Sequence, residues 1–144
     1  MQLPPGITLS IEEKPAEADV EALPEGLEAF NEQQWPGHQP WREIAVFLRR
    51  QGLVAGGLFG ETYAGWLFIR YLWLDATLRR GGLGRGVVAL AEAEARQRGC
   101  HSAYVDTFSF QAPDFWTRNG YIEFGRLDGM PAGHARLWFR KSLV

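Results

Sequence analysis

Apolar and polar residues follow two rhythms along this chain, and each rhythm predicts a type of secondary structure. Residues 7–11 alternate apolar and polar side chains, as a half-buried strand does, and Pro15 ends the pattern. Residues 16–34 are rich in Glu, Ala and Leu, and Pro24 interrupts them. We expect two short helices there, meeting at a kink over residues 23–26.

Three predicted strands follow in close succession, over residues 43–50, 53–60 and 65–75. Short turns between successive strands imply antiparallel neighbours. Residues 66–74 are almost continuously apolar, which is typical of a strand buried on both faces. We therefore place this third strand at the centre of the sheet.

The period then changes to that of a helix. Residues 83–98 repeat apolar side chains at helical spacing, with Glu–Arg pairs on the opposite side, and Gly99 ends the helix. Residues 103–108 read as the next strand, and the order strand, helix, strand calls for a right-handed parallel crossover. A short helix near Pro113 and two strands, over residues 121–127 and 136–143, complete the chain.

The predicted order is β-α-α-β-β-β-α-β-α-β-β. It describes an α/β (α+β) fold with a mixed, mostly antiparallel sheet that holds one parallel strand pair near its centre. The chain has 144 residues, of which 46% are hydrophobic and 13% aromatic. This is long enough for one domain with a hydrophobic core and too short for two ordinary ones, so we expect a single domain over residues 1–144.

Charge and cysteine content narrow the functional classes. The net charge of −2 provides no basic face that would neutralise a phosphate backbone, so we expect no nucleic-acid partner. Cys100 is the only cysteine, which excludes an intrachain disulfide and favours a small packed residue over a catalytic thiol. The N-terminus lacks a signal-peptide pattern, and no apolar run approaches the roughly 20 residues of a membrane span. We expect a cytoplasmic protein without a membrane partner.

The most informative stretch lies between the third strand and the long helix. Glycine lets a ligand oxygen approach the backbone closely, and the first amides of a helix have no intrahelical partner. With the helix dipole and arginine side chains, such a loop can bind a phosphorylated anion. The alternative is a glycine-rich turn with solvated arginines. The loop consists of Arg79, Arg80, Gly81, Gly82, Leu83, Gly84, Arg85 and Gly86.

Two common phosphate loops do not fit this stretch. The dinucleotide fingerprint requires a glycine where this chain has Val87, and the ATP-type loop requires a lysine, which occurs here only at Lys14 and Lys141. The pattern Arg-x-x-Gly-x-Gly, from Arg79 to Gly84, instead resembles the acetyl-CoA pyrophosphate loop of the GNAT superfamily of N-acetyltransferases.

A second stretch resembles the same family. From Ala112 to Tyr121 the chain is similar to the signature Ala-x-x-aromatic-Tyr-x-x-x-Gly-aromatic, at matching spacing. Residues 106–112 and the tail through His134 resemble a bacterial branch of unassigned GNAT proteins. Two correctly spaced signatures in the correct order are more specific than either alone.

The resemblance implies acetyl transfer from acetyl-CoA, with no metal, to a small-molecule or peptide amine. It implies that the parallel strands ending at Leu74 and Phe108 splay apart, with the pantetheine arm along the backbone of residues 72–74. A backbone N–H near Leu74 would then stabilise the oxyanion. The residues expected at the cofactor are Leu72, Trp73, Leu74, Arg79, Arg80, Gly81, Gly82, Leu83, Gly84, Arg85, Gly86, Ser109, Ala112, Phe115 and Trp116.

The catalytic groups depart from the family pattern. The family commonly has a tyrosine that protonates the leaving thiolate, where this chain has Trp116, whose indole N–H only donates a hydrogen bond. Ser109 replaces the usual asparagine. For the base we consider Asp106, then Asp75 and Glu61. Asp75 is equally interpretable as a cap, and Asp106 as a structural hydrogen-bond acceptor.

The acceptor is expected against the loop over residues 33–41, which carries two tryptophans and a histidine. The alternative is that both tryptophans cap the core. Because of Trp116, a non-catalytic acyl-CoA-binding domain stays open as a second function. A homodimer is possible through the apolar last strand, if that strand lies at a sheet edge. The candidate acceptor residues are Asn31, Trp35, His38 and Tyr63, with His134 as a further possibility.

Overall fold

The computed structural model describes residues 1–144 and divides them into two compact units, Met1–His38 and Gln39–Val144. The first unit contains one helix, and the second contains the whole sheet with the remaining helices. Whether both units act as the single predicted domain stays a prediction.

The first unit differs from the sequence-based expectation in two ways. Residues 7–11 form no strand, and Leu9 is 70% exposed. Alternation of side chains is only a propensity, because a strand also needs a neighbour for its backbone hydrogen bonds. Residues 16–34 form one helix, α1 (Glu17–Gln34), and not two, with Pro24 inside it. Glu, Ala and Leu on both sides are strong helix formers, and they carry the helix past the hydrogen bond that proline cannot make.

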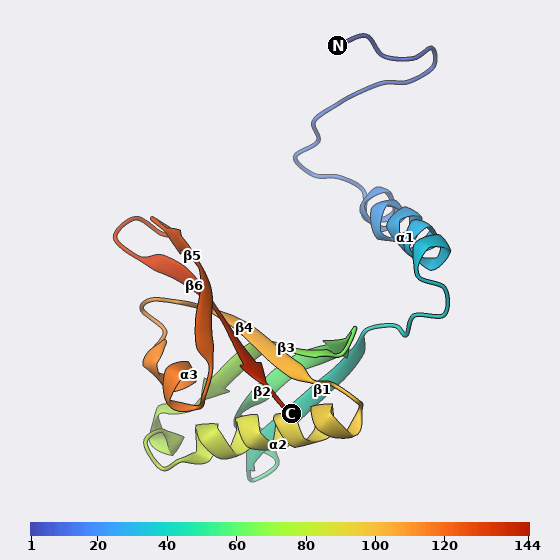
Figure 1. Cartoon of the computed structure of the whole chain (residues 1–144). Helices are drawn as coiled ribbons and strands as arrows, with labels where there is room; N and C mark the ends of the chain where they lie inside the picture. The colour runs from blue at the N-terminus through green and yellow to red at the C-terminus, as the bar shows by residue number, and fades with distance from the viewer. The chain divides into compact units, whose positions relative to one another are not determined.

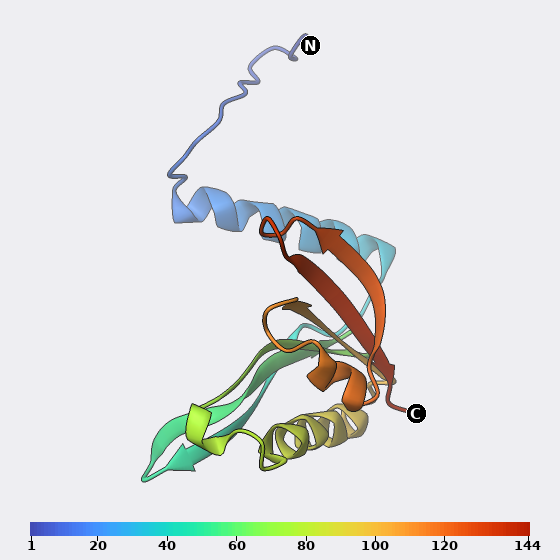
Figure 2. The same cartoon turned by 90° about the vertical axis from the view of Figure 1, so that its left-hand side faces the viewer.

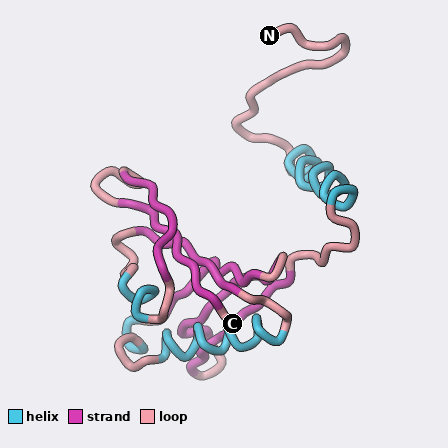
Figure 3. Tube along the Cα trace, viewed as in Figure 1, coloured by secondary structure: helices cyan, strands magenta, loops and turns pink.

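The second unit is a six-stranded sheet with helices on one face (Figures 1 and 3). The predicted strands and helices of this unit are all present, with ends shifted by at most three residues. In chain order they are β1 (Arg42–Arg50), β2 (Leu53–Tyr63), β3 (Trp66–Leu74), the short helix η1 (Ala76–Leu78), α2 (Leu83–Gln97), β4 (Ser102–Phe108), α3 (Asp114–Arg118), β5 (Ile122–Asp128) and β6 (Ala135–Ser142).

The strand order across the sheet is β1-β2-β3-β4-β6-β5. Only β3 and β4 are parallel, joined by the crossover helix α2, as predicted. The expectation that the last strand lies at an edge is wrong: β6 pairs with β4 on one side and β5 on the other. The edge strands are β1 and β5, so a dimer cannot form by strand pairing through β6.

Helices α2 and α3 lie next to each other on one side of the sheet (Figure 2). The core between them and the sheet includes Leu67, Ile69, Val88, Ala91 and Val105. We call the opposite side, which carries side chains such as those of Phe59, Phe68, Tyr71 and Tyr104, the aromatic face.

The position of β3 in the sheet is as predicted, but its burial is not. Its first half alternates between half-buried and buried residues, whereas Tyr71 is 69% and Trp73 52% exposed on the aromatic face. A continuous apolar run therefore does not show that both faces are buried. In this strand the exposed aromatic residues lie in the second half, which no longer pairs with the parallel strand β4.

That departure is visible in the strand register. β3 and β4 pair from Trp66 with Ser102 only as far as Ile69 with Val105, although β3 continues for five more residues and β4 for three. The register between β2 and β3 skips Arg70, which is the extra residue of a β-bulge. A bulge bends and twists its strand. The bulge at Arg70 follows directly after the last parallel pair, and it accounts for the separation of the two strands.

Candidate functional site

The loop between β3 and α2 holds a run of backbone amides without acceptors in the protein. The short helix η1 satisfies the amides of Leu78 and Arg79, and the next loop amide with a backbone partner is that of Gly86, which donates to the Gly82 carbonyl. The amides from Arg80 to Arg85 make no hydrogen bond in the structure. They lie at the N-terminus of a 15-residue helix, so they form a site for an anion.

The glycines of this loop do two different things. A Cβ added at Gly81, Gly82 or Gly86 would meet no atom within 4 Å, which leaves the backbone accessible to a ligand. Gly82 also requires its left-handed φ of 79° as the N-cap of α2. At Gly84 a Cβ would come within 3.2 Å of the Phe115 ring, so this glycine allows α3 to pack against α2.

The arginines around the loop are not equivalent. Arg79 donates from Nε to the Leu74 carbonyl at 2.9 Å, which ties the loop to the end of β3. Arg80 has a φ of 64°, an uncommon conformation for a residue with a side chain, and such outliers gather at functional sites. Arg50, from the β1–β2 hairpin, donates to the Thr77 hydroxyl at 2.8 Å and adds a cation that the sequence pattern does not indicate.

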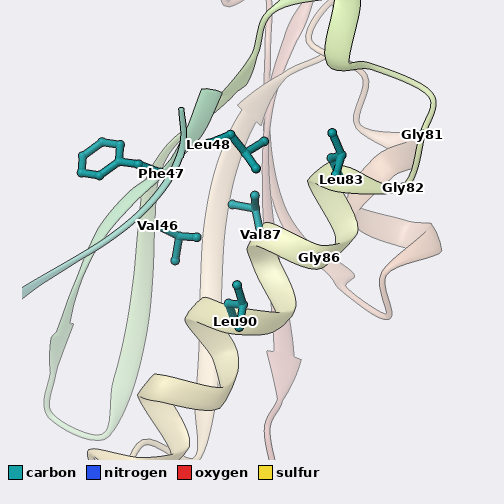
Figure 4. A pocket seen from close by; sticks show the side chains of 9 residues that line it. All are labelled: Val46, Phe47, Leu48, Gly81, Gly82, Leu83, Gly86, Val87 and Leu90. Carbon is teal, nitrogen blue, oxygen red and sulfur yellow. The ribbon is translucent and has the colours of Figure 1, made fainter. Parts of the chain in front are cut away.

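An apolar hollow of about 370 Å³ lies beside this loop, between β1 and the first turns of α2 (Figure 4). The side chain of Leu48 points toward α2, whereas that of Phe47 points away from it (Figure 4). The hollow is lined by Val46, Phe47, Leu48, Gly81, Gly82, Leu83, Gly86, Val87 and Leu90.

Beyond the bulge, β3 presents a backbone edge that no strand occupies. From Tyr71 to Leu74 the strand pairs with β2 on one side and with nothing on the other. The unpaired edge begins where the parallel register ends and finishes at the amide loop. A linear ligand whose phosphates bind at the loop can therefore form strand-like hydrogen bonds along this edge.

Trp116 lies in α3 and is 4% exposed. Its ring makes edge-to-face contacts with Phe115 and Tyr121, both at 5.1 Å between centroids. Behind it, the Tyr121 hydroxyl donates to the buried carboxylate of Glu92 at 2.9 Å, and the Lys141 ammonium donates to both oxygens of that carboxylate at 3.0 and 2.9 Å. Burial and the Glu92 carboxylate raise the pKa of Tyr121 far above its usual range.

Residues 9–121 match the family model described as the acetyltransferase (GNAT) family. The chain belongs to the GNAT family of acetyltransferases. An acetyltransferase of Agrobacterium fabrum is 34% identical to it, over 88% of this chain and 93% of the relative. The blasticidin-S acetyltransferase of Streptomyces morookaense is 43% identical, over 74% of this chain and 88% of the relative. The crystal structure of an acetyltransferase from Bacillus cereus superposes with a TM-score of 0.83 at 29% identity, over 92% of this chain and 97% of that one.

Membership of the GNAT family makes the chain an acyltransferase, whose family uses acetyl-CoA as acetyl donor, and confirms the predicted mixed sheet with one parallel pair. None of the helices combines the length and hydrophobicity needed to cross a bilayer. Cys100 is buried, as expected of a packed residue, and burial raises the pKa of its thiol.

The three candidate bases of this GNAT protein are all engaged. Asp75 caps η1 by accepting from the Thr77 amide and hydroxyl at 2.9 and 2.8 Å, and these bonds lower its pKa. This capping geometry favours the alternative interpretation of Asp75. Glu61 pairs with Arg70 at 2.6 Å. Asp106 accepts from Arg136 at 2.9 and 2.6 Å and is the first residue of β4 beyond the last parallel pair.

The residues of the second GNAT signature, and Ser109 ahead of it, have different surroundings in the structure. Phe115 packs against the first turn of α2, beside the amide loop. The Ser109 hydroxyl instead accepts from the Ala135 amide at 3.0 Å and lies 3.4 Å from Nδ1 of His134, which links the end of β4 to the start of β6. Ala112 has a φ of 58° ahead of α3. A cofactor contact for Ser109 and Ala112 stays a prediction.

Of the predicted acceptor residues, Asn31, Trp35 and His38 lie in the first unit, and Tyr63 lies in the second. His38 contacts the Trp35 carbonyl at 2.9 Å and Glu28 at 2.6 Å, and the bond to this carbonyl raises its pKa, helped by the carboxylate. Tyr63 stacks on Trp41 with centroids 4.4 Å apart. It lies three residues from Gly60, which pairs with Ile69 at the last parallel pair, so the separation along the strand is about 10 Å.

Two features of the site were missed by sequence reasoning. The bulge at Arg70 has no turn or glycine signal within β3. Gly60 lies at the register shift on the partner strand β2, and only the pairing of the two strands reveals the bulge. The Asp106–Arg136 pair joins residues 30 positions apart on neighbouring strands. A diagonal contact of this kind depends on which strand lies beside which, and local sequence does not encode that order.

Proposed function

We propose that this protein transfers the acetyl group of acetyl-CoA to the amine of a small molecule by direct attack within a ternary complex. The observation that carries the proposal is the set of free amides from Arg80 to Arg85, placed where the unpaired edge of β3 ends. An anion site and a free strand edge in series suit a diphosphate followed by the amide-containing arm of CoA.

The path of the arm locates the thioester. With the diphosphate beyond Leu74, the arm passes Leu74, Trp73 and Leu72 before the thioester, which then lies near the bulge at Arg70 and Tyr71. This refines the expectation of an oxyanion donor near Leu74: the proposed donor is a backbone N–H beside the bulge. A bulge leaves backbone groups outside the regular ladder, free to stabilise developing negative charge.

In the proposed step the neutral amine forms a bond from nitrogen to the thioester carbonyl carbon. Collapse of the tetrahedral intermediate breaks the carbon–sulfur bond and releases the CoA thiolate, while the new amide nitrogen loses one proton. We propose that Asp106, the residue after the last parallel pair, accepts a proton directly or through water. The thiolate, whose acid has a pKa of about 8.5, needs little help to leave.

Trp116 takes the position of the family tyrosine but cannot supply a proton. Its indole N–H can only stabilise the thiolate by a hydrogen bond, so water is the proposed final proton donor. The Trp116→Tyr variant tests this role. It should raise kcat if thiolate protonation limits turnover, and an unchanged kcat would show that it does not.

The acceptor class rests on the relatives. One of them is named for acetylation of blasticidin S, a small molecule, and it is 43% identical to this chain. We propose a small-molecule amine for this protein too.

The test begins with acetyl-CoA binding by calorimetry, followed by release of free thiol against a panel of amines. Binding together with amine-dependent thiol release supports acetyl transfer. Absence of any acetyl-CoA binding would remove the proposal, because acetyl-CoA is the proposed acetyl donor.

The second candidate function is a non-catalytic acyl-CoA-binding domain. The observation that favours it is Trp116, which stands where a proton donor is usual and lies 4% exposed against Tyr121. Tight acetyl-CoA binding without thiol release for any amine in the panel would select this function over acetyl transfer.

A homodimer stays part of the proposal by a route other than β6. Helix α1 carries an apolar stripe at helical spacing, which consists of Val20, Leu23, Leu27 and Phe30. An apolar stripe on a helix is normally buried against another protein surface. Light scattering after size exclusion should give twice the mass of one chain.

A further inference from the structure

Arg50, the last residue of β1, lies on the same side of the sheet as the amide loop. Leu48 points toward α2 and Phe47 points away from it (Figure 4), and side chains alternate between the two sides of a strand. Arg50 therefore lies on the side of Leu48, and its guanidinium donates to the Thr77 hydroxyl of η1 at 2.8 Å. Arg49 belongs to the other side, where its guanidinium carbon lies 4.9 Å from the centroid of the Phe47 ring.

A chain of hydrogen bonds fixes the direction of the Arg50 side chain. The Thr77 hydroxyl that accepts from Arg50 donates in turn to Oδ1 of Asp75 at 2.8 Å, and the Thr77 amide donates to the same oxygen at 2.9 Å. Thr77 lies three residues before Arg80, the first residue of the loop with a free amide. Three residues of backbone span at most about 11 Å, so the guanidinium is held close to the start of the anion site.

The residues of this cluster do not balance its positive charge. Arg50 and Arg79 lie near a single carboxylate, that of Asp75, whose pKa is lowered first by the hydrogen bonds from Thr77 and then by the charges of both arginines. The hydroxyl that holds Arg50 is neutral. A guanidinium has five N–H donors, and Arg50 uses one of them within Gln39–Val144. The other four are left for an anionic ligand.

Acetyl-CoA carries a second anion besides its diphosphate, which is the phosphate monoester on the 3′-oxygen of its ribose. Such a monoester has a charge of about −2 near pH 7. The bonds through the ribose between its phosphorus and the nearer phosphorus of the diphosphate reach at most about 8 Å. This length is similar to the separation between Thr77 and Arg80. With the diphosphate on the free amides of the loop, the second phosphate can therefore reach the guanidinium of Arg50.

We propose that Arg50 binds the 3′-phosphate of acetyl-CoA, and so makes the protein select the 3′-phosphorylated cofactor over its dephosphorylated form. The inference rests on the proposed function for the place of the diphosphate. A guanidinium suits this role because its planar fork of donors matches two oxygens of a phosphate, and charge-assisted hydrogen bonds are roughly twice as strong as neutral ones. Thr77 is a positioning residue in this site, because it holds the fork without neutralising its charge.

The test measures the binding of CoA and of 3′-dephospho-CoA to the full chain by calorimetry in low salt. These two ligands differ only in the 3′-phosphate. The wild-type protein should bind CoA about tenfold more tightly, and Arg50→Gln should lower this ratio of dissociation constants to about twofold or less by weakening CoA binding. Equal affinities in the wild-type protein, or an unchanged ratio in Arg50→Gln, would overturn the proposal.

The matched control is Arg49→Gln. It removes the same charge from the neighbouring residue of β1, but Arg49 lies on the other side of the strand and donates to the Gly52 carbonyl at 3.3 Å. This variant therefore reports how far the loss of one positive charge changes the ratio without any contact to the 3′-phosphate. The ratio should stay near tenfold in Arg49→Gln. If Arg49→Gln lowers it as much as Arg50→Gln does, the proposal fails.

Thr77→Val tests the positioning role. The variant removes the hydroxyl that holds the guanidinium and leaves the charge of Arg50 in place. It should lower the ratio about threefold when Arg50 is present and leave it unchanged in Arg50→Gln, because the hydroxyl acts through the arginine. A purely structural change in the loop would weaken both ligands alike and leave the ratio as it was. That result, or an equal effect in both backgrounds, would refute the positioning role.

Failure of this inference and failure of the proposed function give different results. If CoA and 3′-dephospho-CoA bind equally well, the acetyl-CoA site stands and the contact to Arg50 is refuted. If neither ligand binds, the proposed acetyl transfer is refuted together with the inference, because the acetyl donor has no site. Arg50 could also serve only to tie the β1–β2 hairpin to η1. Arg50→Gln would then weaken both ligands by the same factor, and that result would refute the inference.

Discussion

Replacing Lys141 by methionine tests the buried network behind Trp116. The Glu92 side chain is 5% exposed, and its carboxylate contacts the Lys141 ammonium at 2.9 Å and the Arg96 guanidinium at 3.9 Å. Methionine keeps the packing of the lysine stem against Tyr121 but removes the charge that balances the carboxylate. The variant therefore leaves a buried anion with one distant cation and one tyrosine hydroxyl.

The expected loss follows from these distances. Two unit charges about 3 Å apart attract by about 5 kcal/mol at an effective dielectric constant of about 20, and breaking a buried pair on one side costs about 3–5 kcal/mol. Arg96 stays within 3.9 Å, and the Lys141 side chain is itself 25% exposed, so water can reach the site. Both reduce the cost, and we expect a loss of about 2–3 kcal/mol in the free energy of unfolding.

Urea unfolding followed by circular dichroism measures this loss. Lys141→Arg keeps the charge and should stay within about 1 kcal/mol of wild type. Glu92→Gln removes the anion, and the double variant with Lys141→Met should be more stable than the sum of the single effects predicts, by about 1 kcal/mol or more. Additive single effects, or a Lys141→Met protein as stable as wild type, would refute a compensated buried charge.

Four further outcomes follow from the structure. Because the pKa of Tyr121 is raised in the folded state, only the unfolded state ionises this tyrosine above pH about 10. The free energy of unfolding should therefore fall above that pH by up to about 1.4 kcal/mol per pH unit, and by less in Tyr121→Phe. Urea unfolding at pH 9 and pH 11 measures this change. Because the pKa of His38 is raised in the folded state, the protonated imidazole contributes to local stability below pH about 6.5, and this contribution is lost as pH rises through the folded-state pKa. NMR titration should give a pKa of His38 above 6.5, and a lower pKa in Glu28→Gln. Gly82→Ala should weaken acetyl-CoA binding in calorimetry more than Gly81→Ala does. Both variants add a Cβ beside the ligand, but only Gly82 has a left-handed φ, of 79°. Calorimetry at rising NaCl should show weaker acetyl-CoA binding, since screening shortens the reach of the loop arginines, and an unchanged affinity would argue against an anion site there.

The antiparallel pairing of the first strands could be predicted from local sequence because short turns join one strand to the next. The strands over residues 43–50 and 53–60 are joined by the tight turn at Gln51 and Gly52, both with positive φ, and this turn forces an antiparallel pair. The parallel crossover through α2 follows from the length of the connection alone. These are rules that act over a few residues, and they held.

The failures concern interactions between distant parts of the chain. Residues 7–11 have the alternation of a strand but pair with no other strand, and β6 reads as an edge strand although β5 lies outside it. The amide loop was found from its glycines, whereas the two roles of those glycines, backbone access at Gly82 and helix packing at Gly84, needed the position of Phe115. The candidate bases stay predictions. Their partners Thr77, Arg70 and Arg136 are set by strand register and loop geometry, which local sequence does not show.

The net charge of the whole chain differs from that of its two parts, and this difference affects how the anion site works. The value of −2 for the whole chain hides two opposite halves: residues 1–38 hold eight acidic residues and one lysine, and residues 39–144 hold nine acidic and fourteen basic residues. The unit that carries the amide loop therefore has a net charge of +5, and the first unit has −7. A positive unit raises the local concentration of an anionic ligand, and the free amides then orient its phosphates. Composition averaged over the whole chain conceals the field that favours a phosphorylated cofactor, and the absence of a nucleic-acid partner stays a prediction.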